Sequence, residues 1–250
     1  MFDRSRAPAM PIQIEGEWRQ VLAEDFKTPC KRGHFLETYP GWTVYPDTWD
    51  NGHTSYYNGG KSISVAKSRA RLRFYTDVED KPRTETLRPP EGKGREQTYG
   101  RYSLCYRVPD SIPGYKQAFL LWPGSNKGAD GEIDFPEASF DLGSTIRGYV
   151  HEIEPPGSHG TNAYAFDTNT LVTGTGWHVV TIEWRPDSVS FIKDGVYVGN
   201  YESAINVPAA SMTWRIQTEG NLSGSFSDSR IDPLTRGRLD LAWVCAWEMA

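Results

Sequence analysis

Residues 129–138 read Ala-Asp-Gly-Glu-Ile-Asp-Phe-Pro-Glu-Ala, and three of them, Glu132, Asp134 and Glu137, place carboxylates within six positions. In a β-strand Glu132 and Asp134 point to one face, and the apolar residues between them point to the other. Glu137 lies five positions after Glu132, so plain alternation sends it to the opposite face. A bulge inserts one extra residue and corrects that parity, and Pro136 favours a bulge because it cannot donate a ladder hydrogen bond. We therefore expect all three carboxylates on one face of a bulged strand.

Three crowded carboxylates suit one kind of chemistry in particular. Like charges on one face push their pKa values apart, so that one group stays protonated while another stays ionised. Glycoside hydrolysis needs that division, because an acid protonates the leaving oxygen and a carboxylate acts on the sugar carbon. A solvated acidic edge strand and a calcium site are the alternatives that these residues leave open.

The rest of the chain indicates an all-β domain. Its 250 residues include 24 glycines and 17 prolines, which favours many turns and few long helices. Short alternating runs between turn residues are typical of a sandwich or barrel. We expect one domain over residues 16–250, preceded by a flexible N-terminal arm over residues 1–15. The expected strands include 62–75, 100–108, 117–122, 131–137, 145–153, 178–184, 188–193, 213–219 and 238–247.

Composition excludes several classes of function. The net charge of −5 disfavours general nucleic-acid binding, and the longest apolar run, residues 118–122, is far too short to span a membrane. Three cysteines without a CxxC pair indicate neither a disulfide scaffold nor a zinc site. The N-terminal residues lack the apolar core of a signal peptide. Basic residues alternate with apolar ones over residues 61–74, which indicates a strand with a solvated face, with a phosphate-binding stripe as the alternative.

The motif Glu132-x-Asp134-x-x-Glu137 resembles the ExDxxE signature of glycoside hydrolase family 16, in the laminarinase-like branch with the bulged strand. Further segments resemble other parts of that family, and they follow one another in the family's order over roughly residues 20–247. These segments are YGRYSLCYRVP at 99–109, AFLLWP at 118–123, GYVH at 148–151, the block from 177 to 195 that ends in Asp-Gly, and LDLAWV at 239–244.

The resemblance implies a jelly-roll β-sandwich of two antiparallel sheets, with a concave cleft for a polysaccharide. It implies that Glu132 is the nucleophile, that Glu137 is the general acid and then the base, and that Asp134 tunes their ionisation. The implied activity is endo-hydrolysis of a β-linked polysaccharide with retention of configuration, most plausibly of β-1,3-glucan. No cofactor is required for this chemistry, although many relatives hold a structural calcium ion, for which Asp240 and Glu24 are the candidates here.

Alternation and the resemblance together indicate which residues line the cleft. Arg215 and Gln217 share one face of an expected strand, and so do Tyr149 and His151 on another, with His151 at the family's cleft histidine. Trp122 ends the strand before the carboxylates and offers a flat ring on which a sugar face stacks. Asn58 lies where the family supplies substrate contacts.

Other functions on the same sandwich remain open at this point. A non-catalytic carbohydrate-binding domain or a structural domain of a virion or cell surface does not need all three acids. A hydrolase of another wall glycan, such as a galactan, keeps the acids and changes the rest of the cleft. We expect a monomer that acts outside the cell, at the cell surface or on a virion, as the family implies.

Overall fold

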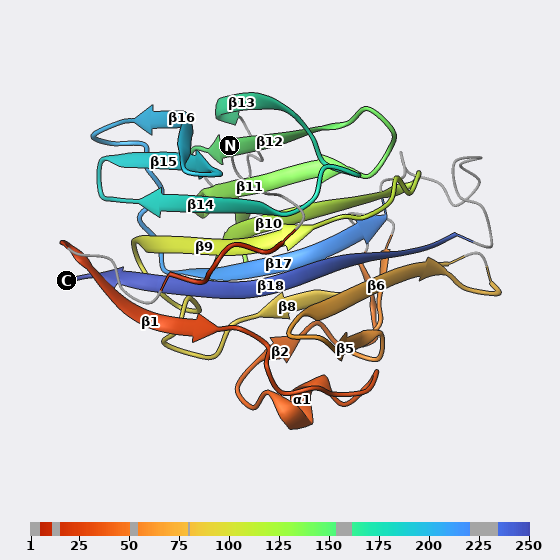
Figure 1. Cartoon of the computed structure of the whole chain (residues 1–250). Helices are drawn as coiled ribbons and strands as arrows, with labels where there is room; N and C mark the ends of the chain where they lie inside the picture. The colour runs from red at the N-terminus through yellow and green to blue at the C-terminus, as the bar shows by residue number, and fades with distance from the viewer. Residues whose placement is uncertain (1–5, 12–15, 51–54, 80, 154–161, 221–234) are drawn as a thin grey trace.

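The computed structural model describes residues 6–11, 16–50, 55–79, 81–153, 162–220 and 235–250 (Figure 1). These residues form two β-sheets that pack face to face, with one short α-helix, α1 (Phe35–Thr38), and one 3-10 turn, η1 (Gly128–Asp130). The predicted all-β sandwich is therefore confirmed. No helix in the described part of the chain is long and apolar enough to cross a membrane.

The larger sheet has 11 strands among the described residues. In Figure 1 its long central strands, β9 and β18, run side by side. Neighbouring strands of this sheet pair antiparallel, except that β4 and β7 run parallel. In spatial order the strands are β16 (Val196–Glu202), β15 (Ser188–Lys193), β14 (His178–Trp184), β9 (Gly100–Arg107), β18 (Arg236–Met249), β6 (Ala70–Thr76), β7 (Pro82–Thr84), β4 (Ser55–Tyr57) and β3 (Trp49–Asp50), with β1 (Trp18–Glu24) paired to β18 and β5 (Ile63–Val65) paired to β6.

The smaller sheet has seven strands in the described residues and carries the carboxylates. All of its pairs are antiparallel. In spatial order they are β13 (Asn162–Leu171), β12 (Thr145–His151), β11 (Glu132–Ser139), β10 (Tyr115–Pro123), β17 (Met212–Gly220), β8 (Thr86–Arg88) and β2 (Thr43–Val44).

Alternation along each strand builds the core between the sheets. Leu72 and Phe74 of β6 and Ile133 and Phe135 of β11 are buried in it. Burying one such side chain contributes about 1.5–3 kcal/mol. Because the apolar residues of β11 face this core, its carboxylates face the opposite surface of the smaller sheet.

A second apolar cluster covers part of the outer face of the larger sheet. Trp177, Trp243 and Trp247 lie in it, beside two of the three free cysteines. The indole Nε1 of Trp243 donates a hydrogen bond to the Pro8 carbonyl at 2.8 Å, so the described residues 6–11 lie against this cluster.

The predicted bulge of β11 is confirmed by its pairing with both neighbours. Asp134 and Glu137 are three residues apart, yet their partners Tyr149 and Arg147 on β12 are only two apart. The same shift occurs against β10, where Leu120 is opposite Asp134 and Ala118 is opposite Glu137. One extra residue therefore lies between Asp134 and Glu137, which returns Glu137 to the face of the other two acids.

Candidate active site

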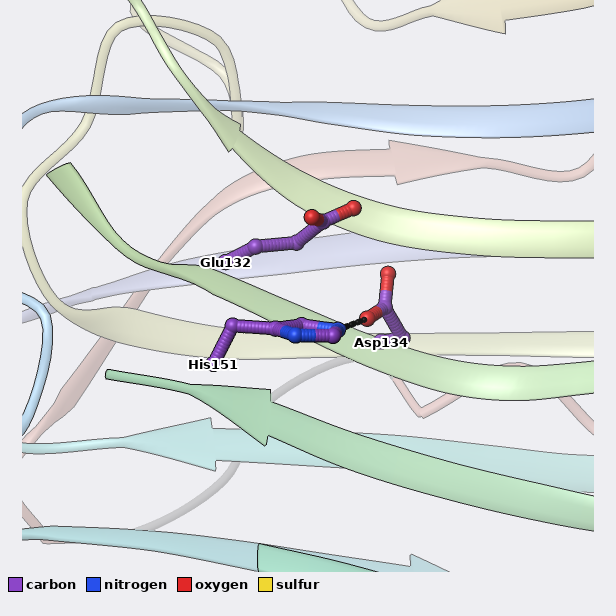
Figure 2. A group of neighbouring side chains, drawn as sticks. All are labelled: Glu132, Asp134 and His151. Atoms are coloured by element: carbon purple, nitrogen blue, oxygen red, sulfur yellow. Dashed lines mark hydrogen bonds and ion pairs between the residues drawn. The ribbon is translucent and has the colours of Figure 1, made fainter. Parts of the chain in front are cut away.

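The three carboxylates of β11 line one open cleft of about 1060 Å³ on the smaller sheet. Figure 2 shows Glu132 and Asp134 on the same side of β11, with the ring of His151 from the neighbouring strand directed at Asp134. Nε2 of His151 lies 2.9 Å from Oδ2 of Asp134, within hydrogen-bond distance. Strand register places this histidine, because His151 is directly opposite Glu132 on β12.

Burial and mutual repulsion raise the pKa values of two of these acids. Burial, followed by the charge of Asp134, raises the pKa of Glu132 to about 9. Burial and the charge of Glu137 raise the pKa of Asp134 well above its usual range. Glu132 and Asp134 are also hydrogen-bonded to each other. At neutral pH the pair therefore shares a proton, and the cluster carries fewer than three negative charges.

Lys116 of β10 places a positive charge beside Glu137. Its Nζ lies 3.0 Å from a carboxylate oxygen of Glu137 and 3.0 Å from one of Glu219. Burial alone would lower the pKa of Lys116, but the two carboxylates outweigh it and raise that pKa. The ammonium is therefore permanently charged, and it fixes the position of Glu137 in the cleft.

The raised pKa of Glu132 makes the stability of the protein depend on pH. In the unfolded chain Glu132 ionises near its ordinary value of 4.5, whereas in the folded protein it holds its proton to about pH 9. The unfolded state therefore binds fewer protons in this window, and the stabilisation present below pH 4.5 is lost progressively as the pH rises to about 9.

Glu132→Gln removes this titration and keeps the shape of the protonated acid, so we expect it to raise the Tm at pH 8. The increase is about 2–4 °C for each kcal/mol gained in a domain of this size. At pH 4 the two Tm values should agree, because both proteins are then neutral at position 132. Thermal unfolding followed by circular dichroism at the two pH values measures this. An equal Tm at pH 8 would contradict the raised pKa.

Four of the predicted substrate contacts line the same cleft as the acids. These residues are Trp122, His151, Arg215 and Gln217. The guanidinium of Arg215 lies over the rings of Tyr45 and Trp122, with its Cζ 5.4 and 5.2 Å from their centroids. Gln217 is buried, and its amide donates a hydrogen bond to Glu219. The cleft thus combines aromatic rings with fixed polar groups, as sugar-binding sites do.

Tyr149 and Asn58 lie elsewhere. Tyr149 lines an adjoining hollow of about 480 Å³, which it shares with Glu137 and Lys116. Asn58 is not among the residues that line the cleft in the described structure. It is 6% exposed, and its Nδ2 donates a hydrogen bond to the Tyr75 hydroxyl at 3.3 Å. The structure does not bring Asn58 to the acids, because the turn after β4 directs its side chain into the protein.

The two residues expected to hold calcium do not meet either. Glu24 is opposite Val244 on β18, and Asp240 is four residues further along, about 13 Å at the usual rise of a strand. Both oxygens of Asp240 accept hydrogen bonds from arginines. The group with metal-ligand spacing in the described chain lies in the cleft, where atoms of Glu132, Asp134 and His151 lie within 4.8 Å of one another.

The residues of the cleft that sequence reasoning missed include Tyr45, Arg88 and Lys116. A signal existed for Lys116, because it has the same strand parity as Trp122 on β10 and therefore points to the same face. Arg88 ends the short strand β8, and Tyr45 directly follows the short strand β2. Their place beside β17 is set by long-range pairing that no local pattern announces.

An open cleft over a sheet, with three carboxylates on one bulged strand, is the kind of site found in glycoside hydrolases. The family model of glycosyl hydrolases family 16 matches residues 43–219. The chain therefore belongs to glycoside hydrolase family 16. A comparison with curated protein sequences finds no match.

Solved structures show the same fold at low sequence identity. An endo-1,3-β-glucanase from Streptomyces sioyaensis is 17% identical with a TM-score of 0.73, over 98% of this chain and 100% of that one. A laminarinase catalytic domain from Thermotoga petrophila is 18% identical with a TM-score of 0.70, over 93% and 98%. A structure described with endo-acting O-glycanases of the human gut microbiota is 18% identical with a TM-score of 0.73, over 93% and 100%.

Proposed function

We propose that this protein hydrolyses a β-linked polysaccharide within the chain and with retention of configuration. The observation that carries the proposal is the bulge of β11, because it places Glu132, Asp134 and Glu137 together in one open cleft. β-1,3-Glucan is the first candidate substrate, since neighbours such as the Streptomyces enzyme act on it. A fold alone does not fix the substrate, and a galactan of the cell wall is the second candidate.

In the proposed mechanism Glu137 enters the step with a proton of its own, and Glu132 attacks the anomeric carbon while Glu137 transfers that proton to the departing oxygen. For this step Glu132 must be ionised, so the proton that it shares with Asp134 moves to Asp134. The hydrogen bond between His151 and Asp134 holds Asp134 in place. Glu137, now a carboxylate beside Lys116, then removes a proton from water, and that water cleaves the glycosyl-enzyme bond. The proposed mechanism uses no cofactor.

Incubation with a polysaccharide panel tests the proposal. The panel holds laminarin, mixed-linkage β-glucan, agarose, carrageenan, xyloglucan and arabinogalactan, and new reducing ends are measured. Proton NMR of the first products shows whether the anomeric configuration is retained. No new reducing ends on any polymer from a well-folded protein would contradict hydrolysis of these glycans and would favour a binding role.

Trp122→Ala is expected to raise KM about 3- to 10-fold, the effect of the 0.5–1.5 kcal/mol that a stacked ring contributes. The indole lines the cleft and stacks on Arg215, but it is not one of the acids, so kcat should change little. Trp122→Phe is the matched control, because it keeps a flat ring and should retain most of the affinity. Initial rates across a substrate series separate KM from kcat. A loss in kcat alone would contradict a binding role for Trp122.

We also propose that the protein acts as a monomer and outside the cell, at the cell surface or on a virion. Glu132, Asp134 and Glu137 all come from the single strand β11, which supports action without a residue from a second copy. Size-exclusion chromatography with light scattering tests the monomer. Wall polysaccharides are too large to be taken up intact, which supports an external place of action.

A further inference from the structure

Five arginines gather on the outer face of the larger sheet, away from the cleft. We call them the arginine patch: Arg69, Arg71, Arg73, Arg107 and Arg238. Arg69 directly precedes β6, Arg71 and Arg73 lie in β6, and Arg238 and Arg107 lie in the adjacent strands β18 and β9. Figure 1 shows β18 between the other two. The patch is unusual because the whole chain has a net charge of −5.

Strand alternation fixes the direction of these side chains. Leu72 and Phe74 of β6, Tyr106 of β9 and Leu239 of β18 are buried in the core between the sheets. Their sequence neighbours in the patch therefore point to the opposite, outer face. The carboxylate cluster lies on the other sheet, so the patch and the cleft are on opposite sides of the sandwich.

One buried acid, Asp240, lies in the middle of the patch. Arg107 donates two hydrogen bonds to its Oδ2, at 3.0 and 2.8 Å, and Arg238 donates one to its Oδ1 at 3.2 Å. Arg69 and Arg71 approach the same carboxylate to 3.8 and 3.9 Å. Within the described part of the chain no other acid pairs with these four arginines.

The fifth member, Arg73, has no acid partner among the described residues. Its guanidinium donates a hydrogen bond to the neutral hydroxyl of Ser64 at 2.7 Å. One carboxylate neutralises one positive charge, so the patch keeps an excess of about four charges.

The fold holds these guanidinium groups in place. Arg69 and Arg107 both lie near the ring of Trp177, with their Cζ atoms 5.6 and 4.7 Å from its centroid. Four of the five guanidinium groups lie within 4 Å of the Asp240 carboxylate, so the patch is a compact cluster of positive groups. Burial, followed by the charge of Arg107, lowers the pKa of Arg69.

A purely structural role accounts for only part of the patch. The Arg107–Asp240 pair joins β9 to β18 and needs no further cations. Arg71 and Arg238 keep 24% and 42% of their side chains exposed, so an external anion has access to them.

We propose that the arginine patch is a second binding site, which takes the repeating anionic groups of an acidic polysaccharide. Arginine forks match the geometry of carboxylate and sulfate groups, and a polyanionic chain brings several such groups to the patch at once. The proposal does not depend on hydrolysis in the cleft. Binding at the arginine patch holds the protein on a charged wall polymer while the cleft remains open.

The test is binding to heparin, which carries sulfates, and to polygalacturonate, which carries carboxylates. Neutral dextran and duplex DNA are the comparison ligands, and isothermal titration calorimetry is run at low and at high salt. The variant Arg71→Gln/Arg238→Gln removes two exposed charges and leaves the Arg107–Asp240 pair intact. The matched control, Arg19→Gln/Lys27→Gln, removes two exposed charges from β1 and the loop after it.

We expect at least one of the two polyanions to bind in a salt-dependent manner, and which one binds identifies the anionic group. The patch variant should bind about tenfold more weakly, since each exposed ion pair contributes up to ~1 kcal/mol. The control should stay within about twofold of the unmodified protein, since its charges lie outside the patch. Equal binding by the patch variant, equal binding of dextran, or displacement of the glycan by DNA would overturn the proposal. The measurement needs no turnover, so it stands whether or not the cleft is active.

Discussion

The Glu132→Gln variant is expected to lose hydrolytic activity by about 10⁴- to 10⁶-fold, the scale found when a nucleophile is removed. An amide has nearly the shape of a carboxylic acid but cannot form the glycosyl ester, so the double displacement cannot begin. Because Glu132 is held protonated in the free protein, the amide also fits its surroundings. The variant should therefore be inactive and at least as stable as the unmodified protein.

Glu96→Gln is the matched control for this experiment. Glu96 lines the same cleft but lies on the exposed loop before β9, outside the bulged strand. The Glu96→Gln variant makes the same chemical change as Glu132→Gln and should keep most of the activity. Reducing-end assays on the preferred polymer, with both variants at equal concentration, compare the two. Near-normal turnover by Glu132→Gln would remove Glu132 from the role of nucleophile.

The sequence was sufficient to predict the architecture and the centre of the site, because both depend on local patterns. The parity of Glu132, Asp134 and Glu137 requires a bulge, and Pro136 marks its position. That reasoning needs no knowledge of neighbouring strands. Alternation likewise placed Arg215 and Gln217 on the correct face of β17.

Features that depend on which strands are neighbours were not predictable in this way. Lys116 and Glu219 meet only because β10 pairs with β17, where the two residues are directly opposite. Asn58 is the opposite error, a residue that was predicted to line the cleft and does not. Its segment precedes the motif-rich part of the chain, and its side chain is buried. The arginine patch also needs the order β6, β18, β9, which brings together arginines from distant parts of the sequence.

The Glu137→Ala variant is expected to cleave the natural polymer about 10²- to 10⁴-fold more slowly, because no acid then protonates the leaving oxygen. A 2,4-dinitrophenyl glycoside of the preferred oligosaccharide needs no such proton, so its first bond should still break at a normal rate. Water is then no longer activated, and the glycosyl ester of Glu132 should accumulate after a burst of dinitrophenolate. Glu219→Gln, which alters the other partner of Lys116, is the control for a change in that ion pair alone.

Azide distinguishes the two carboxylates by stereochemistry. In Glu137→Ala, azide needs no base and displaces the Glu132 ester, so two inversions give a β-glycosyl azide and turnover recovers. In Glu132→Ala, azide attacks the sugar directly, and one inversion gives the α-glycosyl azide. Glu132 and Glu137 share one strand face, and of these two only Glu137 contacts Lys116. The Glu137→Ala variant therefore keeps the carboxylate of Glu132, whereas the Glu132→Ala variant keeps Glu137 and its contact with Lys116. Proton NMR of the azides reads the assignment directly, and an α product from Glu137→Ala would exchange the two roles.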